Sequence, residues 1–399
     1  MKQVSTLPTT SEQAIAFLAK KASLAQWTLI EESLIMSKFK ANLNLEKDLY
    51  EALDWPLDRN SYLAYLDKFQ KWIPQQSQDK VWRKAGTLHS QEMYDRLCHF
   101  YYLTNQITGE GILAEVIPWF KDFLVYFADN WGYFLNSNES FNDEVLISYF
   151  KNAPQYRIQD SILNGRPNSV WNSFNDFFAR ELNPGLRPID TPNDNTIITT
   201  PADCTFKGKY AIDAHSNIDK ITIKQTHSFD NINELLKGSK YSDSFANGTM
   251  VHYFLGPYAY HRFHSPVCGL VKESYPLFDL TYLDIEIKED GQFSTPDNPV
   301  NGYQFSQARG ILTIDTRNSP NGDMGIVAVV PIGMCQISSV HMLATPDTVL
   351  EKGEEFGYFK FGGSDVILLF QEGKAPKIDQ SQDYRHYGNS ISVCPPEYY

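Results

Sequence analysis

The sequence predicts an α+β fold, in which a helical N-terminal region precedes a β-rich region. Two observations support this prediction. Up to about Phe150, apolar residues recur at the spacing of amphipathic helices. After Ile197, the pattern changes to short runs of Val, Ile and aromatic residues that are separated by turn residues. We therefore expect a helical domain at 1–150, a linker with one short helix at 151–196, and a β-rich catalytic domain at 197–399.

Helical spacing is clearest in the stretch SEQAIAFLAKKASLAQWTLIEESLIM, whose first residue, Ser11, is a generic helix cap. Further helices are expected at Ser61–Trp72, Gln91–Thr104 and Ile112–Trp131. The linker is rich in proline and glycine, as in NGRPNS and NPGLRPIDTPND, and these breakers enclose the expected short helix Val170–Glu181.

Strands are expected where apolar or alternating runs lie between turn signals. They are Thr205–Ile212, Asp219–Ile223, Thr249–Leu255, Gly310–Thr316, Gly325–Pro331, Gly357–Phe361 and Val366–Phe370. The tail after Gln371 is polar and contains several tyrosines, and we expect it to be loosely ordered.

Composition excludes several classes of protein. The chain has 399 residues and a formal net charge of −13, which argues against a general nucleic-acid binder and disfavours strong adhesion to anionic lipid. Its apolar stretches are too short to span a bilayer, and the N-terminus lacks the apolar core of a signal peptide. The five cysteines are widely spaced and form no CxxC pair. We therefore expect a soluble cytoplasmic protein without a transmembrane segment.

The segment EKGEEFGYFKFGGSDVILLF contains a Gly-Gly-Ser turn that ends at Ser364. By itself, such a turn is typical of a hairpin or a bulge. However, a serine after glycine can attack the preceding carbonyl, because glycine tolerates a distorted backbone. The peptide bond then becomes an ester. Loss of the serine Cα proton expels the ester, and the dehydroalanine that remains hydrolyses to a pyruvoyl group and ammonia.

Two other segments contain residues suited to acid–base chemistry. YHRFHSP contains His261 and His264, which fit a hydrogen-bonded pair, a metal pair or a general base with a neighbouring acid. No HExxH pattern or convincing third ligand accompanies them, so no metal is expected. TTPADCTFKG contains Asp203, which is either a turn residue or a carboxylate that orients an imidazole.

In combination, four ordered stretches resemble the phosphatidylserine decarboxylase family. They are FNDFFARELNPGLRPID, PADCTFKG, YHRFHSPVCG and GEEFGYFKFGGSDVILLF, and the resemblance runs from about Ser169 to Phe370. It implies a pyruvoyl-dependent carboxy-lyase that is made as a zymogen. Autocatalytic cleavage would fall between Gly363 and Ser364, giving a large β chain and an α chain of residues 364–399.

The resemblance also assigns roles to individual residues. Asp203, His264 and Ser364 match the triad of self-cleavage, in which His264 deprotonates the serine and Asp203 holds the tautomer of the imidazole. His261 matches the histidine that handles a proton during decarboxylation. Ser364 would become the pyruvoyl cofactor and would form a Schiff base with the substrate amine, so no diffusible organic cofactor is expected.

Two residues depart from the family pattern. Cys204 replaces a usual glycine and adds a side chain beside Asp203, and Asp365 replaces a usual threonine directly after Ser364. Both changes bear on the rate of self-cleavage and on the choice of substrate.

The N-terminal region bears on the substrate. One branch of the family, which includes a soluble fungal tryptophan decarboxylase, is similar to this chain in three features. These are the helical extension and the stretches DNWGYFLNS and VVPIGMCQIS. We therefore favour a free amino acid such as tryptophan. The alternative is phosphatidylserine, which would place the protein in phospholipid biosynthesis. The oligomeric state and the partner of the helical domain stay open.

Two other classes remain as rivals. A Ser-His-Asp hydrolase would never cut itself, and Ser364 lacks the GxSxG elbow of such enzymes. A binding protein that keeps the fold while Asp365 blocks maturation is the second rival. Denaturing mass spectrometry separates both from an enzyme that is cut into two chains.

Overall fold

The computed structural model describes most of the chain in two compact units. The described residues are 15–16, 19–83, 89–108, 111, 113–114, 117–161, 171–218, 222–223, 227–228, 231–277, 285–295, 307–334 and 340–392, with only the backbone described at 222–223, 227–228, 334 and 363–364. Ser11, Cys335, Cys394 and the beginning of the strand expected at Asp219–Ile223 lie outside these residues. Within the described residues, no helix combines the length and the apolar character that crossing a bilayer requires.

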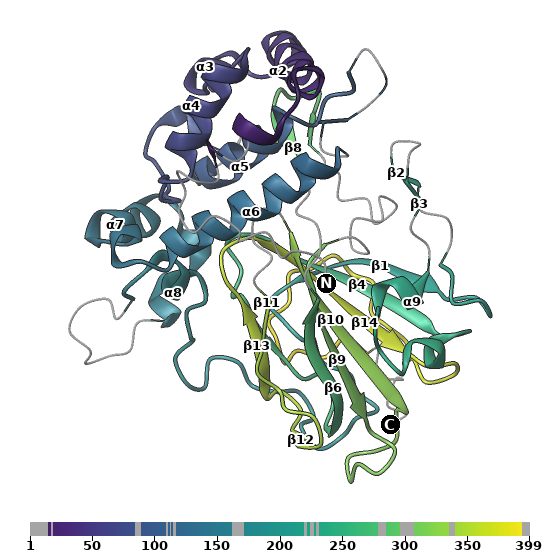
Figure 1. Ribbon diagram of the computed structural model, residues 1–399. Coiled ribbons are helices and arrows are strands. Elements are labelled where there is room, and N and C mark those ends of the chain that lie inside the picture. The colour runs from purple at the N-terminus through teal and green to yellow at the C-terminus, as the bar shows by residue number, and fades with distance from the viewer. Residues whose placement is uncertain are drawn as a thin grey trace. The chain divides into compact units, whose positions relative to one another are not determined.

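The first unit is helical and is drawn in purple and blue in Figure 1. Its helices are α2 (Leu24–Asn44), α3 (Lys47–Ala52), α4 (Arg59–Phe69), α5 (Glu92–Tyr102), α6 (Pro118–Leu135) and α7 (Asp143–Asn152). Helix α2 begins at a capping box, in which Ser23 and Gln26 each accept a backbone N–H of the other. The core between the helices is aromatic, and the ring of Phe69 lies 4.8 Å from that of Phe100 and 5.2 Å from that of Trp131.

A short hairpin from the middle of the sequence also belongs to the helical unit. Its strands are β7 (Glu286–Ile287) and β8 (Phe293–Ser294). The ring of Phe293 lies 5.5 Å from that of Tyr102, and the Glu46 N–H donates to the Gly291 carbonyl at 2.8 Å. A Cβ at Gly291 would lie 2.9 Å from the Glu46 nitrogen, so this close approach requires glycine.

The second unit is built on an antiparallel sheet, coloured from teal to yellow in Figure 1. Among the described strands, seven form this sheet in the order β1 (Thr205–Ala211), β4 (Thr249–Leu255), β14 (Gly363–Phe370), β10 (Ile326–Met334), β9 (Arg309–Asp315), β6 (Gly269–Leu277) and β12 (Val349–Leu350). A smaller sheet joins β11 (Val340–Met342), β13 (Glu355–Phe359) and β5 (Arg262–His264). Strand β14 therefore lies inside the larger sheet, between β4 and β10.

Both faces of the larger sheet are buried, because its strands alternate between two apolar cores. On β14, Val366 and Leu368 belong to one core, and Ile367 and Leu369 belong to the other. The first core also contains Phe263 and Phe359 from the smaller sheet. The second core is completed by buried residues of α9 (Ile232–Leu235) and of the 3-10 turn Ser242–Phe245. The remaining short pair joins β2 (Thr222–Ile223) and β3 (His227–Ser228).

The α+β prediction is confirmed, because a helical N-terminal region precedes a β-rich region. Strand β4 has the expected bounds, and the other long strands that were expected differ from the observed ones by a few residues. The compact units are not continuous in sequence. Trp171–Phe177 and the described part of Leu280–Pro296 group with the helical residues, whereas Gln159–Ser161 group with the β-rich residues.

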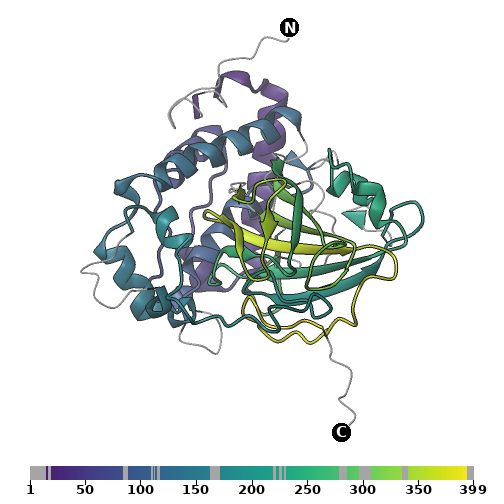
Figure 2. The ribbon, with the colours of Figure 1, turned by 90° about the horizontal axis from the view of Figure 1, so that it is seen from below.

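The expectation of a loosely ordered tail is wrong for residues 371–392. In Figure 2, this yellow segment runs along the outside of the β-rich unit. Ile378 and Ile391 are buried in the first core, and the Ile391 N–H donates to the Ile198 carbonyl at 2.9 Å. Backbone hydrogen bonds also join Arg385 to Cys204 in both directions, each at 2.9 Å. Two apolar residues and a backbone ladder are thus enough to order a mainly polar segment.

Candidate active site

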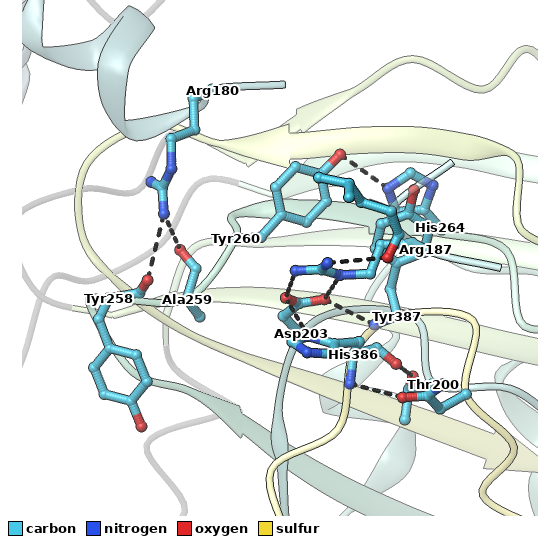
Figure 3. A network of polar contacts seen from close by, with 12 residues as sticks. Arg180, Arg187, Thr200, Asp203, Tyr258, Ala259, Tyr260, His264, His386 and Tyr387 are labelled. Carbon is cyan, nitrogen blue, oxygen red and sulfur yellow. Dashed lines mark hydrogen bonds and ion pairs between the residues drawn. The ribbon is translucent and has the colours of Figure 1, made fainter. Parts of the chain in front are cut away.

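Asp203 lies at the centre of a buried polar cluster (Figure 3). Its side chain is 2 % exposed, and the residue lies two positions before the beginning of β1. Arg187 forms a two-pronged contact with the carboxylate, with Nη2 at 2.9 Å from Oδ2 and Nε at 3.4 Å from Oδ1. His386 Nδ1 lies 3.0 Å from Oδ2, and the Tyr387 N–H donates to Oδ1 at 2.8 Å. The carboxylate thus gathers donors from the linker and from the C-terminal tail.

These contacts keep Asp203 ionised. Burial by itself raises the pKa of a carboxyl group, because it removes water from the charged form. Here the hydrogen bonds from His386 and Arg187, the positive charge of Arg187 and the Tyr387 N–H outweigh burial. The pKa of Asp203 is therefore below its ordinary value of 3.8. Because His386 Nδ1 faces a carboxylate, it is the protonated nitrogen of that ring.

His264 is the last residue of β5 and is almost fully buried. Its Nδ1 lies 2.9 Å from the Gly353 carbonyl, and its Nε2 lies 3.2 Å from the Tyr260 hydroxyl. A carbonyl can only accept, so Nδ1 carries the proton, and the unprotonated Nε2 is the basic nitrogen, which accepts a hydrogen bond from the Tyr260 hydroxyl. Burial, opposed by the Gly353 bond and the Asp203 charge, lowers the pKa of His264 to about 4. The imidazole is therefore neutral at neutral pH.

Tyr387 connects the two groups. Its backbone N–H binds Asp203, while its ring is stacked on the His264 ring at 3.6 Å between centroids and 3° between planes. The Tyr260 ring belongs to the same aromatic group, 5.4 Å from the Tyr387 ring and 5.8 Å from the His264 ring. The hydrogen bond that we expected from Asp203 to the His264 ring is instead made by Gly353, and Asp203 acts on His264 through its charge and through Tyr387.

His261 lies in an apolar enclosure. It is 0 % exposed, and its ring is 4.0 Å from that of Phe178 and 6.5 Å from that of Phe359. Neither ring nitrogen has a hydrogen-bond partner among the described residues. Burial, reinforced by the charge of Arg180, holds the pKa of His261 well below its ordinary value. A neutral imidazole with two unsatisfied nitrogens is costly unless a further group binds there.

Ser364 is placed through its backbone at the beginning of β14. It pairs with Leu255 of β4 and with Gly333 of β10. Leu255 ends β4 and leads into the loop that carries Tyr260 and His261. Before Ser364, the chain passes Phe361, whose ring lies 5.2 Å from the Phe178 ring that also contacts His261. The strand register and these ring contacts bring the expected cleavage site and the histidine segment to one region.

The bond that we expect to be cut is preceded by an unusual backbone conformation. Gly362 has φ 153°, a backbone conformation that residues other than glycine rarely adopt. Gly362 and Gly363 are the only two consecutive glycines that directly precede a serine in the sequence. This part of the chain can change conformation at less cost than the interior of β14.

The residues present fit a pyruvoyl group at position 364. The group needs no metal, and the described residues contain no cluster of three or more ligands that could hold one. It does need a base that is neutral near pH 7 and a proton-handling group in an apolar setting, which His264 and His261 can supply. Cys204 is fully buried, and burial raises the pKa of its thiol, so it is no competing nucleophile.

Arg187, His386, Tyr387 and Tyr260 are site residues that sequence reasoning missed. Arg187 lies within the stretch NPGLRPID, which carried the family resemblance without a role for this arginine. His386 and Tyr387 lie in the tail that was expected to be loose, and no spacing rule connects them to Asp203. A second acid, Asp365, lies apart from this cluster and contacts His252.

Comparison with known proteins identifies the family of the chain. The family model "Phosphatidylserine decarboxylase" matches residues 174–392, more than half of the chain. The phosphatidylserine decarboxylase proenzyme 2 of Oryza sativa is 30% identical over 63% of this chain and 37% of its own length. The decarboxylase iboD of Amanita muscaria is 25% identical over 68% of this chain and 82% of its own length. The phosphatidylserine decarboxylase proenzyme of Clostridium novyi is 32% identical over 52% of this chain and 63% of its own length.

The match includes every residue of the polar cluster, from Arg187 to Tyr387, as well as the Gly-Gly-Ser turn. It begins at Phe174, so the helices before α8 (Phe174–Phe178) lie outside it. The chain spans less than two thirds of the rice and clostridial relatives. The matched region nevertheless contains all described residues of the β-rich unit except Gln159–Ser161, and the chain belongs to the phosphatidylserine decarboxylase family.

Proposed function

We propose that the chain is a zymogen that cuts itself between Gly363 and Ser364 and becomes a pyruvoyl-dependent decarboxylase. The observation that carries this proposal is the state of His264. Its Nδ1 proton is fixed by the Gly353 carbonyl, its Nε2 is unprotonated and accepts from the Tyr260 hydroxyl, and its pKa of about 4 keeps the ring neutral. A buried, neutral imidazole with a fixed tautomer is suited to act as a general base.

In the proposed maturation, the Ser364 hydroxyl attacks the carbonyl carbon of Gly363. Its proton passes to His264 Nε2, a C–O ester bond forms, and the Gly363–Ser364 C–N bond breaks as the Ser364 nitrogen takes up the proton from His264 and becomes a free amine. Removal of the Ser364 Cα proton then breaks the Cβ–O bond and releases the Gly363 carboxylate. The dehydroalanine left at residue 364 takes up water and loses ammonia, which leaves a ketone. No oxidant or reductant is needed, because every step is a proton transfer, an elimination or a hydrolysis.

Asp203 supports this base without touching it. It holds the Tyr387 backbone, and the Tyr387 ring covers one face of His264. Its negative charge also favours the imidazolium that forms when His264 takes a proton. Arg187 and His386 keep Asp203 charged and oriented.

The pyruvoyl group supplies an electron sink for the bond that releases CO2 from the amine-bearing carbon of the substrate. The role of the protein's own residues is to exclude water and to move one proton. We assign this task to His261, and the assignment is supported by its unsatisfied nitrogens and by its apolar neighbours Phe178 and Phe359. A carboxylate that enters such a setting loses its hydration, which favours its departure as neutral CO2.

For the substrate, we propose a free amino acid with a flat side chain, such as tryptophan. The sequence similarity to a soluble fungal branch supports this choice. The match with the decarboxylase of Amanita muscaria also covers most of the length of that protein. Phosphatidylserine is the second candidate, because the rice and clostridial relatives are named as its decarboxylases. The wide spacing of the cysteines, together with the absence of a disulfide at the described residues Cys98, Cys204 and Cys268, supports a cytoplasmic location.

Denaturing mass spectrometry of freshly purified protein tests maturation. We expect a chain of residues 1–363 and a chain of residues 364–399 whose first residue is blocked by a pyruvoyl group. Ser364→Ala should remain one chain and should be inactive, and His264→Ala should also stay uncut. A wild-type protein that remains one chain and resists carbonyl-trapping reagents would contradict the proposal and would favour the non-maturing binding protein.

The substrate is tested on the mature protein with tryptophan, other free amino acids and phosphatidylserine liposomes. Release of CO2 from tryptophan is the expected result. Release of CO2 from the liposomes alone would show that the substrate is the lipid and not a free amino acid. An uncut protein with esterase activity would instead favour the Ser-His-Asp hydrolase.

A further inference from the structure

A second histidine–aspartate pair lies one residue beyond the proposed cleavage site. Asp365 follows Ser364 on β14, and His252 lies on the neighbouring strand β4. His252 Nε2 is 3.2 Å from Asp365 Oδ1, with side chains that are 2 % and 0 % exposed. This is the distance of an ion pair, although the angle between the groups is not that of a hydrogen bond. None of the steps proposed above uses this pair.

The register explains how these two residues meet. Across β4 and β14, Asp365 is opposite Phe254, and His252 is opposite Ile367. His252 and Asp365 are therefore diagonal neighbours on one face of the sheet, within reach of long side chains. This face also carries Met250, Ile367 and Leu369 of the second apolar core. The contact thus crosses from one strand to the next inside an apolar layer.

Stability alone does not account for this pair. Replacing a buried ionic pair by apolar residues of similar volume is often neutral or stabilising by about 1–4 kcal/mol. His252 Nδ1 also has no hydrogen-bond partner among the described residues, which adds to the cost of burial. A position next to Ile367 and Leu369 would accept a branched aliphatic residue more favourably.

The position of Asp365 suggests a different purpose. When the Gly363–Ser364 bond is cut, β14 changes from a continuous strand into one that begins at a chain end. Chain ends fray unless other contacts hold them. The reactive residue would be the first of the new chain, and Asp365 would be the second. A side-chain contact from Asp365 to β4 would join this new end to the larger fragment.

We propose that His252 is a positioning residue that anchors the pyruvoyl-bearing chain end through Asp365. This inference rests on the proposed function, because it requires that the cut occurs. The anchor acts after cleavage, when the covalent bond to Gly363 no longer fixes residue 364. His252 does not touch the reacting atoms in this role. It limits the movement of the strand that carries them.

The test uses the purified full chain with His252→Leu and Asp365→Val, which together restore an apolar face. We expect this double variant to be cut and to unfold at the wild-type temperature or above it. Its kcat should fall about tenfold or more, because small displacements of a reacting group cost large factors in rate. Its KM should change less than twofold, since the contacts to the substrate are kept. The single variants Asp365→Asn and His252→Gln should lose activity in the same direction.

Amide hydrogen exchange supplies a readout that a purely structural role would not change. In the cut double variant, we expect faster exchange at residues 365–367 than in the cut wild type. In a Ser364→Ala background, where the chain is continuous, the same two substitutions should change this exchange little. Asp315→Asn is a matched control, because Asp315 also lies in this sheet but pairs with the exposed Arg317.

The two proposals fail in different ways. A wild-type chain that is never cut refutes the proposed function, whatever the variants do. A wild type that is cut and active, together with a double variant of unchanged kcat and unchanged exchange, refutes the anchor alone. A double variant that loses activity only because its unfolding temperature falls is also evidence against the anchor.

Discussion

Replacing Asp203 by asparagine tests the buried cluster that supports the proposed base. Asparagine has nearly the same size, and its amide oxygen can still accept the Tyr387 N–H. However, it is neutral, so Arg187 would remain charged at 5 % exposure without its counter-charge. His386 would lose the acceptor that fixes its tautomer. We therefore expect the variant to lose stability and to mature slowly.

The magnitude follows from the burial of the ion pair. Removing one partner of a buried pair costs about 3–5 kcal/mol, because the other charge stays buried. Asparagine keeps one of the contacts to the carboxylate, so we expect a loss near the lower end, about 3 kcal/mol. For a unit of this size, 1 kcal/mol corresponds to roughly 2–4 °C in Tm. The unfolding temperature should therefore fall by about 6–12 °C.

Differential scanning calorimetry on Ser364→Ala protein measures this change without the complication of a cut chain. The matched control is the double variant Arg187→Met with Asp203→Leu, which removes both charges and should lose much less stability than Asp203→Asn. A Tm for Asp203→Asn within about 2 °C of its parent would show that Arg187 is compensated elsewhere and would refute the reasoning.

The pH dependence gives an independent check. The folded pKa of Asp203 is below the ordinary 3.8, so the folded state favours the ionised form. The group therefore contributes stability above the unfolded pKa, and this contribution is lost as the pH falls through the folded pKa. The difference in stability between parent and Asp203→Asn should be full near neutral pH and should shrink below about pH 4.

Four further predictions concern the same unit. Tyr387→Ala should slow self-cleavage, whereas Tyr387→Phe should not, because stacking on His264 needs the ring alone; the fraction of cut chain over time measures both. Self-cleavage should slow as the pH falls toward about 4, where His264 takes up a proton, and a flat rate would contradict its role as base. Gly357→Ala should destabilise the fold by more than about 1 kcal/mol in urea unfolding, because its Cβ would lie 2.1 Å from the Phe263 ring. The two chains of the mature protein should elute together in native gel filtration, because β14 pairs on both sides.

The sequence was most informative where the physical pattern is local. The alternation of apolar residues predicted β4 and most of β14, since both strands place successive side chains into two cores. Strand β6 (Gly269–Leu277) was missed, because its sequence GLVKESYPL has a proline and charged residues at half-buried positions. Strand β5 was missed because three residues give no period.

The site divided in the same way. Asp203, His261, His264 and Ser364 were predicted because each lies within a short motif. His386 was not predicted, since it lies 183 residues from Asp203 in the sequence and reaches it through backbone pairing of the tail. Arg187 lies only 16 residues before Asp203, but its stretch NPGLRPID has no period that would assign it a partner. The tautomer of His264 depends on a carbonyl, and a carbonyl has no signature in a sequence. Contacts to the backbone and contacts across long loops could only come from the structure.

The interior position of β14 has a consequence for the order of events in the cell. The strand that would become the small chain completes the sheet between β4 and β10, and the segment after it delivers His386 to Asp203. Neither fragment could therefore assemble its core alone, so the precursor must acquire its shape before it is severed. Two separately translated pieces should therefore fail to reconstitute the enzyme. The chain would have to be continuous while it folds and would have to be cut afterwards to become active.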